Sequence, residues 1–481
     1  MPGKSVVRSL TLTAMGLVLA ATSAQAETLK EALAKAYRNN PSLSAARAQQ
    51  RATDEDVPIS KADGRPSASL SGEYDENMHR AYPWSTAERG ATGTLSMSVP
   101  IYSGGAVRNS VKAAQANVES GLNNLRATES SIFSAVVAAY MDVIRDSAIV
   151  SLNRQLVKSL EVNLQASTDR FEVGDLTRTD VAQSESRLAL ARADLQGAEA
   201  RLISSKENYI ALIGSPPDAL ETPPALAGLP DAVETAVIVA LKDNPDILSA
   251  QQAREAARYQ VRVSKAQNAP RVSAFASGSY ADFFHSEPIG YPPDTKAVSA
   301  GMKLSVPLYQ GGRPAALERQ SVARESASIE QMIGVERDVI AQTRAAYASW
   351  QASLQSIEST RKAVETTALS LEGVKAENSV GSRTILDILN AEQEALNARV
   401  QLVAAERDAY VAAFTLLAAM GHAEARDLQL DIAAPYDAPG RYKQVRGKWF
   451  DYDYAATPQT QSTRTVDTPA QTADLPPVNQ P

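Results

Sequence analysis

The chain has 481 residues, carries 55 acidic and 48 basic side chains for a formal net charge of −7, and contains no cysteine. The missing cysteine excludes a disulfide framework, a thiolate metal site and a cysteine nucleophile, and the acidic balance gives no reason to expect a nucleic-acid partner. Aromatic residues make up only 5%, which together with abundant Ala, Leu, Gln, Glu and Arg is typical of long helices.

The first residues resemble a targeting segment. Lys4 and Arg8 precede a largely apolar run over 10–21 and the small-residue sequence Ala24-Gln25-Ala26. This order of a basic, an apolar and a small-residue part predicts a signal peptide over 1–26, so that the mature chain begins near Glu27.

The rest of the sequence reads as two copies of one unit. Asn40-Pro41 returns as Asn244-Pro245 at an offset of 204, and Val99-Pro100-Ile101-Tyr102 returns as Val306-Pro307-Leu308-Tyr309 at 207. Helices, strands and turns keep nearly the same spacing, which indicates an internal duplication. We therefore predict a first repeat over 27–214, a Pro-rich linker over 215–230 and a second repeat over 231–432.

Each repeat contains one predicted β-hairpin. In the first, Leu95, Met97, Val99 and Ile101 alternate with Thr94, Ser96 and Ser98, and the segment 298–308 alternates in the same way in the second. A period of two with one apolar and one polar face predicts strands. The hairpins should cover about 67–102 and 271–309, with long loops over 75–89 and 281–295. A proline and two glycines follow at each strand-to-helix junction: Pro100, Gly104, Gly105, Pro307, Gly311 and Gly312.

Past each junction the pattern becomes helical. No proline interrupts the stretches after Pro100 and Pro314 for more than a hundred residues, and Phe133, Val136, Val137, Tyr140 and Ile144 fall on a single helical face. Long helical hairpins are predicted at about 106–213 and 314–420, with reversals at Gly174 and Gly381. The stretch 106–172 alone would be roughly 100 Å long.

The C-terminal segment, 433–481, differs from both repeats. Several aromatic residues lie among charges before position 455, and a Thr/Gln/Pro-rich stretch follows. Such a stretch cannot bury a core of its own, which predicts a disordered tail after about residue 455.

Four amphipathic strands are too few to close a membrane barrel, whose smallest members have about eight strands. Several chains would therefore have to combine. With apolar faces toward lipid and Ser/Thr faces toward water, the combined strands would form a channel that the helices prolong as a tube.

These motifs resemble the TolC family of outer-membrane efflux and type I secretion ducts. The resemblance rests on Leu29-Lys30-Glu31-Ala32-Leu33, the duplicated Val-Pro-(Ile/Leu)-Tyr-x-Gly-Gly strand ends, and 173–181 with 379–389. It implies a mainly α protein with a β-barrel part, a homotrimer whose 12-stranded outer-membrane β-barrel continues into a 12-helix periplasmic α-barrel. The implied location is the outer membrane of a Gram-negative bacterium, in contact with its lipid and extending into the periplasm.

The resemblance also implies partners: a periplasmic adaptor (membrane fusion protein) and an inner-membrane ABC or proton-driven transporter, acting in type I protein secretion, multidrug efflux or both. Protein and drug cargo stay equally open. A periplasmic coiled-coil adaptor or structural protein without its own pore is the alternative, but it would not require a duplicated amphipathic hairpin.

Functional residues are implied by the same resemblance. The pore constriction corresponds to Asp387 and Asn390, with an amide in place of the second carboxylate of the family, and a link that closes the tip corresponds to Arg383 with Thr179 and Asp180. Asp180 and Asp387 each follow a threonine by three residues, so helix capping is an alternative explanation for both and is compatible with a role in the closed tip.

No nucleophile elbow, phosphate loop or metal-ligand spacing is found around His79, His285 and His422, so we expect no enzyme activity, no metal and no cofactor.

Overall fold

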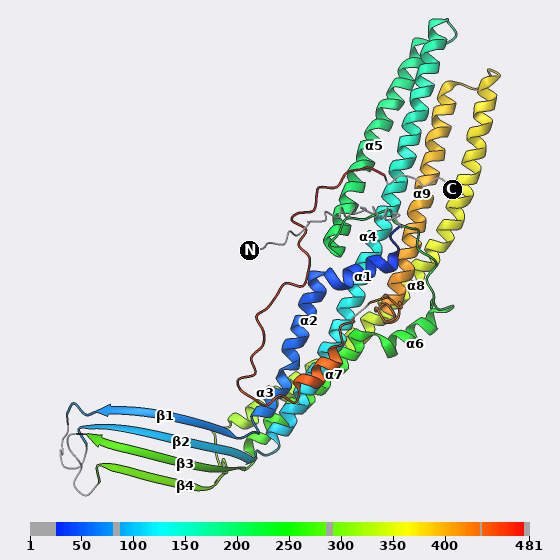
Figure 1. The fold of residues 1–481 in the computed structure, drawn as a ribbon. Helices are drawn as coiled ribbons and strands as arrows, with labels where there is room; N and C mark the ends of the chain where they lie inside the picture. The colour runs from blue at the N-terminus through cyan, green and yellow to red at the C-terminus, as the bar shows by residue number, and fades with distance from the viewer. Residues whose placement is uncertain (1–25, 80–86, 285–291, 433–434, 476–481) are drawn as a thin grey trace, which may run out of the picture.

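The structure, a computed structural model, describes residues 26–79, 87–284, 292–432 and 435–475. The predicted signal peptide lies outside these ranges except for Ala26, and so do His285 and parts of the two predicted loops. Two long helical hairpins run side by side (Figure 1). A four-stranded sheet extends from the end of the helices opposite to the hairpin turns.

The two halves of the chain contain the same elements in the same order. The first half comprises α1 (Leu29–Asn39), α2 (Pro41–Asp54), α3 (Asp56–Ala62), β1 (Ser67–Glu76), β2 (Arg89–Tyr102), α4 (Ala106–Glu172) and α5 (Arg178–Ile213). The second half comprises α6 (Val233–Asp243), α7 (Pro245–Lys265), the short 3₁₀ helix η1 (Ala266–Asn268), β3 (Arg271–Phe284), β4 (Asp294–Ser305), α8 (Arg313–Ser379) and α9 (Ile385–Ala419). The predicted duplication is thereby confirmed, and α10 (Ala438–Val445) follows it.

The long helices match the predicted stretches closely. Both α4 and α8 have 67 residues, which corresponds to roughly 100 Å at 1.5 Å per residue. Within the described ranges, none of the helices contains a segment both long and apolar enough to cross a membrane.

The repeated Asn-Pro motif attaches a short helix to the end of a long one. Asn40 caps α2 by accepting hydrogen bonds from the amides of Ser42 and Leu43, while its Nδ2 donates to the carbonyl of Leu212 at 2.9 Å. Asn244 does the same for α7 and the carbonyl of Ala419, also at 2.9 Å. One side chain thus satisfies groups at the start of one helix and at the C-terminal end of another, both of which lack intrahelical partners.

The four strands form one antiparallel sheet in the order β1-β2-β3-β4. Leu70 lies opposite Leu95 and Ser69 opposite Ser96 across the first hairpin, so each face of the sheet keeps its apolar or polar character. β4 ends at Ser305, short of the predicted residue 309. β2 continues to Tyr102 because its last residues pair with β3, whereas the chain after Ser305 has no strand opposite it.

Glycines connect the strands to the long helices. Gly104 and Gly105 have φ of +64° and +82°, in the left-handed region that side chains disfavour. A Cβ on Gly104 would lie 2.2 Å from Cβ of Ala269, closer than two non-bonded carbon atoms can approach. The equivalent Gly311 and Gly312 have φ of +60° and +79°, so both junctions turn in the same way.

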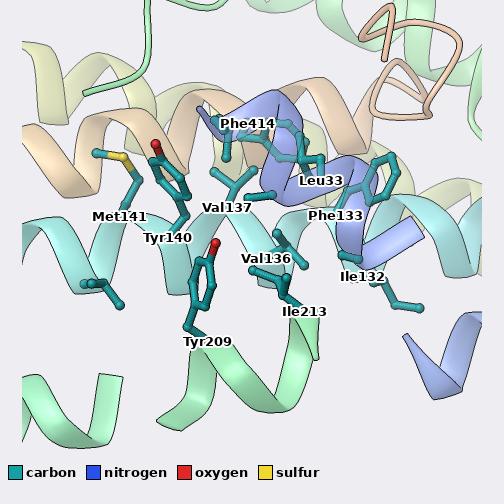
Figure 2. Close-up of a cluster of buried hydrophobic side chains, with 14 of the residues drawn as sticks. Leu33, Ile132, Phe133, Val136, Val137, Tyr140, Met141, Tyr209, Ile213 and Phe414 are labelled. Carbon is teal, nitrogen blue, oxygen red and sulfur yellow. The ribbon is translucent and has the colours of Figure 1, made fainter. Parts of the chain in front are cut away.

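The main core lies where α1, α4, α5 and α9 converge (Figure 2). Four residues of the predicted apolar face of α4 are completely buried there: Phe133, Val136, Val137 and Tyr140. Leu33, Tyr209, Ile213 and Phe414 pack around them. The Tyr140 hydroxyl lies 2.8 Å from the carbonyl oxygen of Glu27 and 2.6 Å from that of Glu221, tying the start of the first repeat to the linker.

The prediction of a disordered tail after residue 455 is wrong as far as residue 475. Lys206 donates hydrogen bonds to the carbonyls of Thr472 and Asp474, and Glu207 accepts one from the amide of Gln471. Figure 1 shows this segment as a dark red trace running back along the helices. It has no core of its own, but charged side chains of α5 satisfy its backbone groups.

The Asn40 contact makes a testable prediction. Asn40→Ala removes both the cap and the bond to Leu212, and we expect it to cost about 1 to 2 kcal/mol of stability, seen as a lower thermal unfolding midpoint in detergent. Asn40→Asp keeps the capping oxygen but loses the donor, so it should fall between. Asn39→Ala is the matched control, and equal midpoints for all four proteins would contradict the proposed role.

Candidate functional site

The candidate site comprises the turns of the two helical hairpins, at the end of the molecule farthest from the sheet (Figure 1). Gly174 and Gly381 occupy equivalent positions with φ of +82° and +81°. Just beyond each glycine, an amide bonds back five residues: Asp175 to the carbonyl of Arg170 at 2.8 Å, and Ser382 to that of Glu377 at 3.0 Å. This is the usual way in which a helix ends at a left-handed glycine, and it fixes the shape of both turns.

Each return helix begins with a capping box that contains a predicted site aspartate. The Asp180 carboxylate accepts from the amide of Thr177 at 3.0 Å and from its hydroxyl at 2.7 Å. Asp387 accepts from the amide and hydroxyl of Thr384 at 2.9 and 2.8 Å. The capping role considered for both residues is therefore confirmed, and it leaves their charges at the tips of the hairpins.

The caps also set the charge state of the two carboxylates. Hydrogen bonds from the hydroxyl and amide of Thr177 lower the pKa of Asp180 below its ordinary value. Those from the amide and hydroxyl of Thr384, with a smaller contribution from the Arg383 charge, lower the pKa of Asp387. Hydrogen bonds to a carboxylate favour its ionised form, so both groups remain negative at neutral and mildly acidic pH.

Arg383 pairs within its own turn. Its Nε lies 2.7 Å from Oε2 of Glu377, and the Asn378 side chain donates to the Arg383 carbonyl at 2.7 Å. Within one chain Arg383 thus bonds to Glu377 instead of the predicted Thr179 and Asp180, because the turn brings residues six apart together. A link to these two residues in a neighbouring subunit stays a prediction.

Asn390 connects the two hairpins. Its Oδ1 accepts a hydrogen bond from Nη2 of Arg187 at 2.7 Å, which joins α9 to α5. Asp387 and Asn390 are three residues apart on α9 and share a helix face. The predicted constriction therefore combines the Asp387 carboxylate, the Asn390 amide and the Arg187 guanidinium, which is hydrogen-bonded to that amide.

A buried carboxylate two residues beyond Asn390 on α9 links three helices. Glu392 is 5% exposed, and it accepts hydrogen bonds from Ser159 at 2.8 Å and Asn163 at 3.0 Å, both on α4. Lys375 of α8 lies 2.9 Å from the same carboxylate. Burying a charge is costly unless it is paired and hydrogen-bonded, and Glu392 has both kinds of partner.

Sequence reasoning did not identify Arg187, Glu392 or Lys375. Nothing in the local pattern distinguishes them from the many charged residues on solvated helix faces, and each acts through a residue that is distant in sequence. Within the described part of the chain, no group of three or more His, Asp or Glu side chains is placed to hold a metal ion.

Comparison with known proteins agrees with this architecture. The sequence profile of the family described as "Outer membrane efflux protein" matches residues 32–215 and again residues 237–422. The outer membrane efflux protein BepC of Brucella suis is 35% identical over 439 residues, covering 90% of this chain and 94% of that protein. The outer membrane protein TolC of Escherichia coli is 24% identical over 433 residues and covers 86% of each chain.

Solved structures share the fold. The outer membrane protein VceC of Vibrio cholerae superposes with a TM-score of 0.70 at 24% identity, covering 82% of this chain and 96% of that one. The CmeC outer membrane channel of Campylobacter jejuni gives a TM-score of 0.74 at 15% identity over 87% and 89% of the two chains. With a family profile that matches both repeats and a relative that is similar over nearly its whole length, this chain belongs to the TolC-like outer membrane efflux protein family.

Proposed function

We propose that three copies of this outer-membrane protein join edge to edge and form one continuous export duct. The observation that carries the proposal is the four-stranded sheet, whose outer strands β1 and β4 each have one edge that no strand in the described part of the chain pairs with. Unpaired backbone groups cannot remain exposed in the apolar interior of a bilayer. Three copies would supply twelve strands to a closed sheet, and their long helices would continue it as a periplasmic tube.

The duplication supplies a register for that closure. β3 begins 204 residues after β1, and β4 pairs with β3 in the register that β2 has with β1: Ser67 lies opposite Ser98, and Arg271 opposite Ser305. In the duplication, β4 corresponds to β2 and β1 corresponds to β3. Inside one chain, β2 pairs with β3 so that Ser98 lies opposite Phe275. If β4 pairs with β1 of the next copy in the same way, Ser305 lies opposite Ser71.

This register is chemically consistent. It places Lys303 opposite Glu73, an opposite-charge pair on the polar face, and Met302 opposite Tyr74 on the apolar face. Directly opposed side chains of these kinds stabilise neighbouring strands. The side-chain alternation also stays in phase across the junction between subunits, as a lipid-facing wall requires.

For the helical turns we propose a constriction built from Asp387 and Asn390, closed by Arg383 of one subunit against Thr179 and Asp180 of the next. The Arg383–Glu377 pair is exposed on both sides, and exposed ion pairs contribute little stability. Exchanging Glu377 for a carboxylate of another subunit is therefore energetically accessible.

We further propose that the duct acts with a periplasmic adaptor and an inner-membrane transporter, and that it has no catalytic role of its own. Relatives include the alkaline protease secretion protein AprF of Pseudomonas aeruginosa, 27% identical over 71% of each chain, alongside the efflux protein BepC. Protein secretion and drug efflux are both consistent with these similarities, and co-purification of the transporter with its adaptor identifies the cargo class.

The duct itself is tested by conductance. The purified protein should form ion-conducting trimers in planar bilayers, and Arg383→Ser should raise their conductance by weakening the closed tip. Arg170→Ser is the matched control, because Arg170 forms the equivalent pair with Asp175 in the other turn at 2.7 Å. A protein that inserts but never conducts would refute the proposal.

The charge of the constriction makes a second prediction. Asp387→Asn should weaken block by a trivalent cation, Arg187→Gln should strengthen it, and Asp180→Asn should change it little. Because hydrogen bonds lower the pKa of Asp387, block should persist as the pH falls from 7 to 5. It should be lost only below the ordinary carboxyl range of about 4. Unchanged block in both constriction variants would place the constriction elsewhere.

A further inference from the structure

A cluster of exposed aromatic side chains follows α10. Trp449, Phe450, Tyr452 and Tyr454 lie within six consecutive residues, and they are 61%, 81%, 83% and 78% exposed. Single exposed apolar residues are common, but a contiguous group of large ones usually marks a contact surface. We call residues 449–454 the aromatic segment.

The aromatic segment has a fixed position beside the sheet. Arg65, two residues before β1, donates a hydrogen bond to the carbonyl of Lys448 at 2.8 Å, and its guanidinium lies 5.3 Å from the centre of the Trp449 ring. Lys61 donates to the carbonyl of Arg446 at 2.7 Å. The segment is therefore held at the level where the helices give way to the strands.

The helix before it is anchored by packing. Val445 is buried, and Tyr442 packs against the small cluster of Val57, Ala114 and Val118. α10 also lies against α2. The aromatic side chains are thus exposed although the backbone that carries them is fixed, so their exposure is a property of the fold.

Basic side chains outnumber acidic ones along this part of the chain. Between residues 441 and 454 there are four basic side chains, Arg441, Lys443, Arg446 and Lys448, and two acidic ones, Asp451 and Asp453. All four cations are exposed. One of them, Lys448, is neutralised by Asp453 at 2.8 Å.

Apolar side chains are also exposed at the strand ends. Ile101 and Tyr102 at the end of β2 are exposed, as are Leu308 and Tyr309 at the equivalent position of the second repeat. In an outer-membrane protein with periplasmic helices, this level coincides with the periplasmic surface of the bilayer. The aromatic segment therefore lies at the level where the lipid-facing strands end.

We propose that the aromatic segment and the basic residues that precede it, Arg441, Lys443, Arg446 and Lys448, form a lipid-binding belt that lies in the headgroup region of the periplasmic leaflet. Its partner is anionic phospholipid. Tryptophan and tyrosine favour the membrane–water interface, where an apolar ring and a polar group are both accommodated, and cationic side chains beside them attract anionic headgroups. Such a belt would fix how deeply the trimer sits in the membrane.

Quenching by lipid tests the position of Trp449. A variant with Trp84→Phe and Trp350→Phe leaves Trp449 as the single tryptophan, and it is reconstituted into vesicles of phosphatidylethanolamine and phosphatidylglycerol whose acyl chains carry bromine near the headgroup or near the chain end. We expect a blue-shifted emission that the shallow bromines quench more than the deep ones. An emission that neither lipid quenches, while aqueous acrylamide quenches it fully, would overturn the proposal.

A second measurement tests the preference for anionic lipid. Adding phosphatidylglycerol should raise the thermal midpoint of the wild-type trimer in detergent, and this rise should be lost with Arg446→Gln and Lys448→Gln together and reduced with Trp449→Ser and Phe450→Ser together. Val466→Ser is the control, since Val466 is equally exposed on the same C-terminal segment, between Thr463, which bonds to Gly214, and Gln471, which bonds to Glu207 of α5. An equal rise in all variants would contradict the belt. Conductance of the same samples reports separately on the duct.

Discussion

The unpaired edges of β1 and β4 are the constraint on which the whole assembly depends. Two hairpins from the duplicated halves pair with each other inside one chain, which satisfies the inner strands and leaves the outer ones open. Water can bond to an open edge but lipid cannot. In the proposed assembly, other copies of the chain complete the sheet, and the number of helices around the tube would follow from that closure.

The duplication gives a repeated framework, but the two halves use it differently at the tips. Both turns have the same glycine geometry and the same capping box, so their shapes agree. Only the second hairpin, however, holds Glu392 against α4 and Asn390 against α5. These two contacts fix α9 against the first hairpin. They thereby fix the position of Asp387, which α9 carries, relative to Arg187, which α5 carries.

Much of the fold could be predicted because it depends on local patterns. The change from a period of two to a helical period located the strands, and the predicted stretch 106–172 coincides with α4. The glycines at 174 and 381 marked both turns. Each of these features is determined by residues within a few positions of one another.

The contacts between the hairpins could not be predicted in this way. Arg187 and Asn390 are 203 residues apart, and their contact depends on how the two hairpins are rotated about each other. The pair between Arg383 and Glu377 within the second turn was not predicted, because the family pattern directed attention to the other turn. The tail was misjudged because composition describes a segment but not the Lys206 and Glu207 side chains that hold it.

Disulfide cross-linking between subunits tests the central claim most directly, since the natural chain has no cysteine. The register derived from the duplication places Ser71 of one subunit opposite Ser305 of the next, with both side chains on one face. A Ser71→Cys, Ser305→Cys variant should therefore form a covalent trimer on oxidation. The Gly72→Cys, Ser305→Cys variant, whose thiols lie on opposite faces, should not. Recovery of both variants only as uncross-linked monomers from outer membranes would contradict the account.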